Sequence, residues 1–574
     1  MLSLNTERSK GTTGDSLELT DVLKNGTLST LANEDICEKN DSSTSGSRET
    51  VGRAKDDTNY PKGAKMFLIV VSLCLAVFLM ALDNSVITTA IPKITDDFGS
   101  VLDVGWYGSA YLLTTASLQL IFGKIYTFWS IKLVFLSTIA VFELGSLICA
   151  VAPSSTAFIV GRAIAGSGSA GIFSGALLII THTSPLAKRP TYIGLAGGMY
   201  GIASVAGPII GGVLTDNVSW RWCFYINLPL GGVTALAIWL ILKDPQRDVP
   251  TLQTWMDRIR VLDPIGTLIF LPAMVCLLLT LQWGGSKYSW NDGRIIALLV
   301  LSGVLIIAFL LIQLRLQEAA TVPPRIFRNR SVWAGCLYGF CTSSAFFLVI
   351  YYIPIWFQAI QGVSAIESGI RNLPMMISTI LMSIMVGGLV TALGYYTPFM
   401  IAAAILSSVG AGLVSTFAVH TSSGKWIGYQ ILFGIGYGLG SRQPLVAVQA
   451  ALETKDIPIG TSIIMFLQTL GGMIFVSIGN SIFTNSLVNS LAHNVPSVNP
   501  TIITTTGATD IKNIVSAEEL PKVLIAYNHA LDQAFLAAAA MAALSVFGSV
   551  LVPWLSVKQN YHEVDEPVNE TTSK

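Results

Sequence analysis

From Met66 almost to its end, the chain is a succession of long apolar runs separated by short polar segments. Each run holds about 20 residues, the length that an α-helix needs to cross the hydrocarbon core of a bilayer. The pattern predicts fourteen such helices and therefore an all-α polytopic membrane protein. Their expected positions are residues 66–90, 105–123, 131–152, 157–180, 191–214, 222–242, 262–282, 294–314, 331–357, 371–393, 395–417, 425–450, 458–482 and 533–556.

Three stretches of the chain are polar instead. Residues 1–64 are rich in Ser, Thr, Asn and charge, which predicts a disordered tail. Residues 558–574 form a short acidic tail. Residues 485–528 make the single long polar segment between predicted helices. Lys and Arg are more frequent in the loops that lie inside if both termini are cytoplasmic, as the positive-inside rule requires. We therefore expect cytoplasmic termini and an outer loop at 485–528.

Glycine-rich helices recur eight predicted spans apart. "GRAIAGSGSAGIFSG" is followed one span later by "VAGPIIGG", and "FGIGYGLGSRQP" is followed by "LQTLGGMIFVSIGN". This spacing predicts two six-helix halves, 65–245 and 321–557, with two inserted helices in 246–320. Parallel repeats of this kind are typical of transporters. The alternative is that the glycines only permit close helix packing, as in any membrane bundle.

The composition excludes several classes of protein. Hydrophobic residues make up 52% of the chain and charged residues 12%, whereas soluble domains hold about 25% charged residues. The net charge is zero, so no nucleic-acid partner is expected. The cysteines show no metal-binding spacing, and neither a P-loop nor a catalytic triad is apparent. We expect no enzyme, no cofactor and no metal, but a monomer in a lipid bilayer whose partners are a small-molecule substrate and protons.

Four charged residues fall well inside predicted spans, where each costs roughly 2.5–3.5 kcal/mol on insertion scales. Asp83 and Arg162 lie at similar depths, so they could form an ion pair that either couples protons or is structural. Glu143 lies near mid-span, where desolvation favours the neutral carboxyl. It could carry a proton or hydrogen-bond to a neighbouring helix. Arg442 lies towards an inner end, where we expect it to snorkel inward rather than bind substrate.

Polar and aromatic residues inside the spans are candidates for a substrate pocket. Tyrosines in "FFLVIYYIPIWFQAIQG" could contact a planar ligand, although an aromatic belt at the membrane interface explains Trp356 and Phe357 equally well. The candidate pocket residues are Asn84, Gln119, Tyr351, Tyr352, Gln358 and Gln443.

The segment "VAGPIIGG" places the poorest helix formers inside an apolar run. Pro208 removes a backbone hydrogen bond and kinks the helix. Gly207, Gly211 and Gly212 leave a face without side chains, which predicts the close approach of a neighbouring helix.

These motifs together resemble a known family. "LDNSVITTAIPKI", "GRAIAGSGSAG", "GIASVAGPIIGGVLTDNVSWRWCFYINLPLG" and "YYIPIWFQAIQGVSAIESGIRNLP" are similar to segments of the fourteen-span drug:proton antiporters of the major facilitator superfamily. The resemblance runs from Met66 to about Val557 and is greatest to fungal exporters of mycotoxins and drugs. It implies the major-facilitator fold, a role for Arg162 in proton transfer, and a "GPIIGG" motif that seals the path and favours exchange over leak.

The chain also departs from the family pattern. In "GKIYTFWSIK", Thr127 and Ser130 stand where the family has Asp and Gly, so the conformational latch attributed to that Asp cannot be carried over. Ala203 replaces an earlier glycine of the antiporter motif. Arg442 stands where the branch usually has Gln, which leaves the type of substrate open.

The predicted function is proton-coupled efflux of a mycotoxin, secondary metabolite or drug by alternating access, with Asp83, Arg162 and Glu143 as coupling residues. The plasma membrane is the expected location, with a vacuolar or vesicle membrane as the alternative. An importer or facilitator of a siderophore or nutrient on the same scaffold remains the second hypothesis. A receptor or scaffold would need a larger soluble domain than the tails and one loop provide.

Overall fold

The computed structural model describes residues 60–99, 103–244, 256, 261–285, 288–496, 515–516 and 518–558. The predicted tails lie outside this part of the chain, apart from a few residues next to the helices. The first helices are α1 (Ala64–Phe98), α2 (Val104–Phe128), α3 (Ile131–Val151), α4 (Ser155–Thr183), α5 (Arg189–Asn217), α6 (Trp222–Tyr225) and α7 (Asn227–Ile241). A short 3-10 turn, η2 (Leu186–Lys188), leads into α5.

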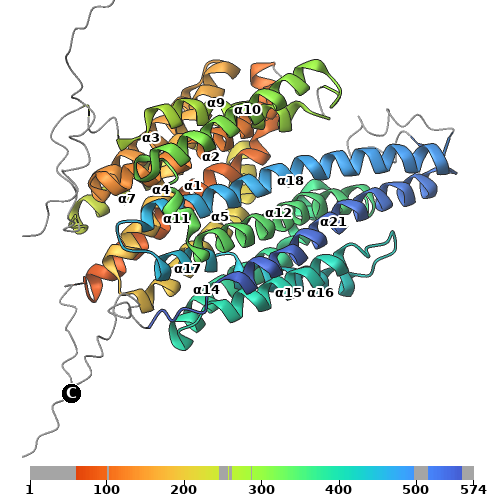
Figure 1. Cartoon of the computed structure of the whole chain (residues 1–574). Helices are drawn as coiled ribbons and strands as arrows, with labels where there is room; N and C mark the ends of the chain where they lie inside the picture. Colours follow the sequence, from red (N-terminus) through yellow and green to blue (C-terminus); the bar gives the residue numbers. More distant parts are fainter. Residues whose placement is uncertain are drawn as a thin grey trace, which may run out of the picture. The chain divides into compact units, whose positions relative to one another are not determined.

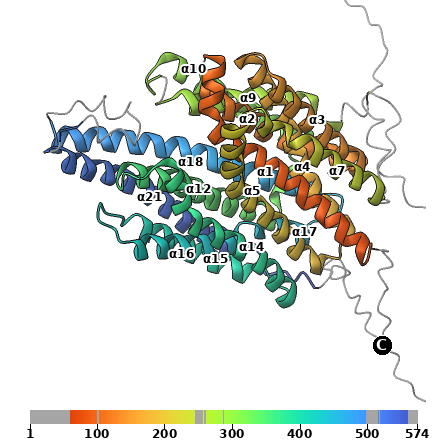
Figure 2. The same ribbon diagram turned by 180° about the vertical axis from the view of Figure 1, so that it is seen from behind.

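The remaining elements follow after residues that are not described. They are α9 (Pro264–Trp283), α10 (Gly293–Leu316), η3 (Gln317–Ala319), α11 (Pro324–Arg328), α12 (Arg330–Ala359), α13 (Ala365–Arg371), α14 (Leu373–Leu393), α15 (Thr397–Val414), α16 (Ser423–Gly440), α17 (Gln443–Ala451), α18 (Ile457–Asn494) and α21 (Leu520–Leu551). Figures 1 and 2 show these helices from opposite sides.

Twelve helices of the described residues are long and apolar enough to cross a membrane. Two predicted spans, at 105–123 and 425–450, are not among them. Both form helices, but α2 carries glycines, hydroxyls and Lys124, while α16 is rich in glycine and carries Lys425 and Gln430, so neither is apolar enough. Length and composition therefore support a multi-pass membrane protein with twelve candidate spans, and the count of fourteen is not confirmed.

The helices pack in two groups. In the first, α1 packs along α5 and α7, while α2 and α3 both pack on α4. In the second, α12 packs on α18 and α21, α15 packs on α16 and α21, and α14 packs on α16. The pair α9 and α10 pack on each other, and α9 contacts both α2 and α18 (Figure 1).

Small residues let the two groups approach closely along α5 and α14. A Cβ added to Gly194 would lie 2.6 Å from the Ser383 carbonyl oxygen, and one added to Gly198 would lie 2.8 Å from Ile384. The hydroxyls of Thr191 and Thr391 are 2.8 Å apart across the same contact. The contact therefore joins the N-terminal part of α5 to the C-terminal part of α14.

The predicted extent of the outer loop, residues 485–528, was wrong. Helix α18 continues to Asn494, and α21 begins at Leu520, so only the residues between them connect the two helices. The reason lies in side chains that the average polarity of the segment conceals. Leu487, Leu491 and Val523 are buried in one apolar cluster, which holds the two helix extensions together.

Candidate functional site

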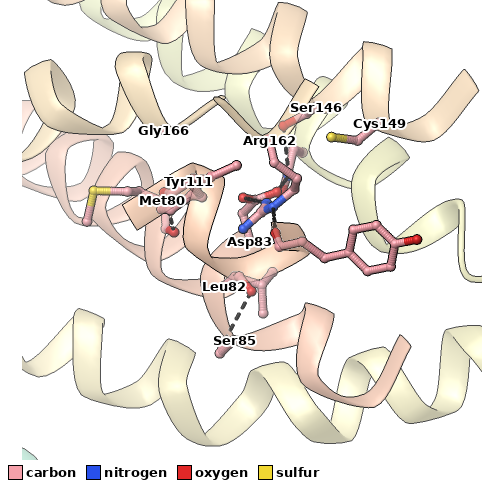
Figure 3. A network of polar contacts seen from close by, with 12 residues as sticks. Met80, Leu82, Asp83, Ser85, Tyr111, Ser146, Cys149, Arg162 and Gly166 are labelled. Atoms are coloured by element: carbon pink, nitrogen blue, oxygen red, sulfur yellow. Dashed lines mark hydrogen bonds and ion pairs between the residues drawn. The ribbon is translucent and has the colours of Figure 1, made fainter. Parts of the chain in front are cut away.

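A buried ion pair joins α1 to α4. The guanidinium of Arg162 lies 2.5 Å from a carboxylate oxygen of Asp83, and both side chains are fully shielded from solvent (Figure 3). Helix α4 lies against both α2 and α3, and its small residues allow this close packing. The structure therefore brings together two residues that sequence alone placed only at similar depths.

Other polar groups complete the shell around this ion pair. Arg162 Nε donates to the Tyr107 carbonyl at 2.9 Å, and the guanidinium lies 4.4 Å from the centre of the Tyr111 ring. Asn227 donates to the second Asp83 oxygen at 3.0 Å and lies 3.1 Å from the Ser146 hydroxyl. The carboxylate thus has a partner on each oxygen, which a buried charge requires if it is to remain ionised.

Sequence reasoning missed Asn227. It is the first residue of α7 and stands in "FYINLPLG", a polar side chain at the start of an apolar helix. That position was itself the available signal. Two atoms of this shell, Nη2 of Arg162 and the side-chain oxygen of Asn227, are buried without a hydrogen-bond partner among the described residues. The shell therefore has unused hydrogen-bonding capacity that a proton, a water molecule or a substrate group could use.

Glu143 lies apart from this ion pair, on α3. Both of its carboxyl oxygens are buried and have no hydrogen-bond partner in the described part of the chain. They lie against Gly231 of α7, beside a small cavity that Leu79, Ile172 and Thr234 help to line. The expected alternative of a hydrogen bond to a neighbouring helix is not seen. A carboxyl in such a setting is far less costly in its protonated form.

The glycine-proline segment of α5 faces α1, directly after Asp83. A Cβ added to Gly207 would collide with Ser85, and one added to Gly211 would lie 2.7 Å from the Val86 carbonyl oxygen. Ser85 also donates to the Ala203 carbonyl at 2.9 Å, one turn before Pro208. The close approach of α1 thus depends on the first two glycines of the motif.

Gly212 behaves differently from the other two glycines. A Cβ built there would meet no heavy atom within 4 Å, so the expectation that Gly212 shares the packing face was wrong. In a helix, positions four residues apart lie on one face, as Gly207 and Gly211 do, whereas the next residue points about 100° away.

The candidate pocket residues do not form a single cluster. Asn84 lies beside the Tyr200 hydroxyl of α5. Gln119 is buried between the two helix groups, where it donates to Ser174 at 2.6 Å and lies 3.9 Å from the sulfur of Met465. Gln119 therefore faces the junction between the groups, whereas the contact of Asn84 lies within the first group.

The residues predicted from α12 lie elsewhere. The side chain of Tyr351 is 52% exposed, while Tyr352 is buried among apolar residues of α18 and α21. Gln358 donates to the neighbouring α13 at 3.1 Å. Trp356 and Phe357 are fully buried, and the Trp356 indole donates to α21 at 2.8 Å. An interface belt therefore does not describe them.

The prediction that Arg442 snorkels toward the inner surface is wrong. It occupies the interruption between α16 and α17, and its guanidinium lies over the rings of Phe173 at 5.1 Å and Tyr200 at 5.9 Å, on α4 and α5. The adjacent Gln443 is buried, with an unpartnered side-chain oxygen. Cation–π attraction to the aromatic faces of the other helix group stabilises the side chain in this position.

Lys124 of the "GKIYTFWSIK" segment also has an unexpected position. It is buried, and its ammonium group donates to the backbone carbonyls of Ala319 at 2.6 Å and Val261 at 3.2 Å. Thr127 bonds within its own helix, and Ser130 caps α3. The loop that lacks the family's Asp therefore anchors the segments before α9 and after α10.

Comparison with known proteins identifies the family. The model of the Major Facilitator Superfamily matches residues 73–476. The chain is 54% identical over 518 residues to the MFS-type efflux pump MFS1 of Arthroderma benhamiae. The alignment covers 90% of this chain and 97% of that pump. It is 48% identical over 512 residues to efflux pump aflT of Aspergillus parasiticus, in an alignment that covers 89% of this chain and 99% of aflT.

Solved structures show the same fold at low sequence identity. The proton:xylose symporter XylE superposes with a TM-score of 0.56 at 13% identity, covering 86% of this chain and 97% of that one. The human organic anion transporter MFSD10 gives a TM-score of 0.56 at 13% identity, covering 84% and 100%. The chain thus belongs to the Major Facilitator Superfamily and is a membrane transporter, closely related to fungal efflux pumps, rather than an enzyme.

Proposed function

We propose that this protein exports a small organic molecule, such as a mycotoxin, secondary metabolite or drug, in exchange for protons. The names of its relatives support export, since MFS1 and aflT are called efflux pumps and match 90% and 89% of the chain. The single observation that carries proton coupling is the ion pair of Asp83 with Arg162, because a carboxylate held at this depth is a natural proton site.

Protonation offers a direct physical route from this ion pair to a change of shape. A neutral Asp83 no longer compensates Arg162, so the pair loses most of its mutual attraction. Asp83 is on α1, while Arg162 is on α4. Proton arrival therefore weakens one link between two helices of the same group, and proton release restores it. Glu143, in its mostly apolar cavity on α3, is a second proton carrier in this proposal.

We propose that the chain crosses the membrane fourteen times. Helix α2 has 25 residues and spans about 37 Å, enough to cross the hydrocarbon core. Helices α16 and α17 are consecutive in sequence, and together they supply the other missing span. Broken spans are common in transporters because the break exposes backbone and side chains to a ligand.

The two six-helix halves, 65–245 and 321–557, correspond in this proposal to the moving units of alternating access, with the helices of 246–320 inserted between them. The contact of α5 with α14 involves Thr191, close to the inner end of α5 in the predicted orientation. Gly123 of α2 touches Ser462 of α18 at the same end. In the predicted orientation, with both termini in the cytoplasm, these contacts close the bundle toward the inside.

The plasma membrane is the location that suits an exporter of toxic products, and a vacuolar or vesicle membrane would serve sequestration instead. The protein needs no second copy for the proposed cycle, since both halves are in one chain.

The proposal is tested by expressing the chain in cells that lack their own exporters and following the accumulation of dyes and fungal metabolites, with and without a protonophore. We expect lower accumulation that rises to the control level when the proton gradient is abolished. Accumulation that follows the substrate's own gradient and ignores the protonophore would instead support a facilitator for a siderophore or nutrient.

A further inference from the structure

A second charged site lies where the span formed by α16 and α17 is interrupted. Arg442 stands between Gly440, the last residue of α16, and Gln443, the first of α17. Its side chain is partly exposed and forms neither an ion pair nor a hydrogen bond with any described residue. A guanidinium inside a membrane protein normally has an acidic or carbonyl partner, so this cation has unused binding capacity.

Aromatic rings of the first helix group lie beside the guanidinium. Phe173 of α4 and Tyr200 of α5 lie beneath it. Tyr437 of α16 interacts electrostatically with Arg442, and its ring stacks on Phe346 of α12, with ring centres 3.9 Å apart and planes within 9° of parallel. Tyr200, Tyr437 and Phe346 are partly exposed, as Arg442 is, whereas Phe173 is buried.

Two neutral polar groups near Arg442 are also without partners. A point at the Cβ position of Gly197 lies 2.9 Å from both Arg442 Nε and the Ser383 hydroxyl oxygen, so these groups border the same small space. The Ser383 hydroxyl is buried and unpartnered among the described residues, as is the side-chain oxygen of the neighbouring Gln443. A native protein rarely leaves several buried polar groups unsatisfied unless something else binds them.

We propose that Arg442, with Ser383 and the rings of Phe173 and Tyr200, is the recognition site for an organic anion with a planar conjugated ring system, such as a carboxylate, enolate or phenolate. This inference rests on the proposed export function, and it names the substrate class. Two N–H groups of a guanidinium can donate in parallel to the two oxygens of a carboxylate. The rings supply flat apolar contact, which binding sites for small organic molecules use together with a few polar groups.

The position of the site suits an exported substrate. It lies at the junction of the two groups, because Phe173 and Tyr200 belong to the first and Arg442 to the second. A ligand bound there contacts both, so its presence favours one arrangement of the groups over another. Arg162 shares α4 with Phe173, but neither Asp83 nor Arg162 belongs to the proposed substrate site, which leaves the proposed proton site free while substrate is bound.

The test compares two dyes that share one xanthene ring system: fluorescein, which is anionic, and rhodamine 6G, which is cationic. Binding to the purified full-length protein is measured by fluorescence anisotropy for wild type, Arg442→Gln, Arg442→Lys and Ser383→Ala. We expect wild type to prefer fluorescein. Arg442→Gln should weaken fluorescein binding by about tenfold to a hundredfold, as the loss of a charged hydrogen-bond partner implies, while rhodamine 6G binding stays within about twofold.

Arg442→Lys keeps the positive charge but not the paired N–H donors of the guanidinium. Its affinity for fluorescein should lie between those of wild type and Arg442→Gln. Arg294→Gln removes the same charge from an exposed position at the start of α10 and should change neither dye. Fluorescein binding that Arg442→Gln leaves intact, or a wild type that does not prefer the anion, would overturn the inference. Fluorescein that binds through Arg442 but is not exported against a gradient would instead contradict the proposed export function. Folding of each variant is checked by gel filtration and thermal unfolding.

Discussion

Two arginines inside the helical bundle show opposite ways of holding a charge away from water. Arg162 is fully buried, and Asp83 and the Tyr107 carbonyl accept hydrogen bonds from it. Arg442 is partly exposed, and its guanidinium lies over aromatic rings without an acidic partner among the described residues. The first charge is compensated within one helix group, whereas the second lies between the groups and is uncompensated by the described residues.

The difference separates two tasks. A charge compensated by an acidic partner is sensitive to the protonation of that partner, so the Arg162 site can respond to protons. A charge that lacks an acidic partner can be compensated by a bound anion, so the Arg442 site can respond to substrate. If this division is correct, variants at one site should change proton coupling and variants at the other should change substrate preference.

The largest expected effect is at Asp83. Asp83→Asn leaves Arg162 as a buried charge without its counter-ion, which destabilises the fold by about 3–5 kcal/mol and removes the proton site. We expect pH-driven transport in proteoliposomes to be abolished, although the protein still inserts into the membrane. Arg442→Gln, in contrast, should keep the pH dependence for a substrate that it still binds.

A double variant separates the two consequences of Asp83→Asn. Asp83→Asn with Arg162→Gln removes both charges, so the melting temperature should recover toward wild type while coupling stays absent. Retained proton coupling in the single variant, at equal amounts of inserted protein, would remove Asp83 from the mechanism.

The next effect concerns the helix contact that holds α1, and with it Asp83, against α5. Gly211→Val should force the two helices apart, because even a Cβ there would lie 2.7 Å from a backbone oxygen of α1. We expect efflux to fall by about tenfold or more. Gly212→Val is the matched control, since its Cβ points into open space. Equal efflux by both variants at equal surface expression would contradict a sealing role for the motif.

A smaller effect is expected at Asn227, which donates one hydrogen bond to Asp83. Asn227→Ala removes a bond to a charged group, a contribution of about 1.5–3 kcal/mol. The rate of proton-driven exchange should fall about tenfold, and substrate affinity measured by dye binding should not change. Asn217→Ala alters an exposed asparagine at the end of α5 and serves as the control. A loss of dye binding in Asn227→Ala would indicate that the two sites are not separate.

The smallest effect is expected at Gly231, against which the Glu143 carboxyl lies. Gly231→Ala should push this flexible side chain aside and reduce the rate of proton-driven exchange a few-fold. Glu143→Gln should reduce the rate to a similar extent, because the amide cannot carry a proton as the carboxyl does. Gly232→Ala, where a Cβ meets nothing within 4 Å, should match wild type. Exchange rates of Gly231→Ala and Glu143→Gln that equal the wild-type rate would exclude Glu143 from the proton path.

Most of the fold could be predicted from the sequence, because a membrane helix needs a run of apolar residues that is visible without any knowledge of neighbours. The prediction was wrong where the signal depends on partners. Leu487, Leu491 and Val523 belong to short apolar stretches within a segment that is polar on average. They are buried together only because α18 and α21 lie side by side.

The candidate sites were harder to predict for the same reason. Charge inside an apolar run identifies Asp83, Arg162 and Glu143 directly, but it says nothing of which residues they face. The hydrogen bond between Asn227 and Asp83 joins residues that are 144 positions apart in the sequence. The ring contact between Arg442 and Phe173 joins residues that are still further apart. Only the packing of the helices brings such groups together.

The central claim is that substrate and protons move in opposite directions through a mechanism that requires Asp83. The most direct test is to load proteoliposomes with a pH-sensitive dye, impose a gradient of a transported dye or metabolite, and record internal pH for wild type and Asp83→Asn. The account predicts a substrate-driven proton flux in wild type that a protonophore collapses and that Asp83→Asn lacks. Substrate movement with no proton flux, equal in both proteins and indifferent to the protonophore, would contradict it.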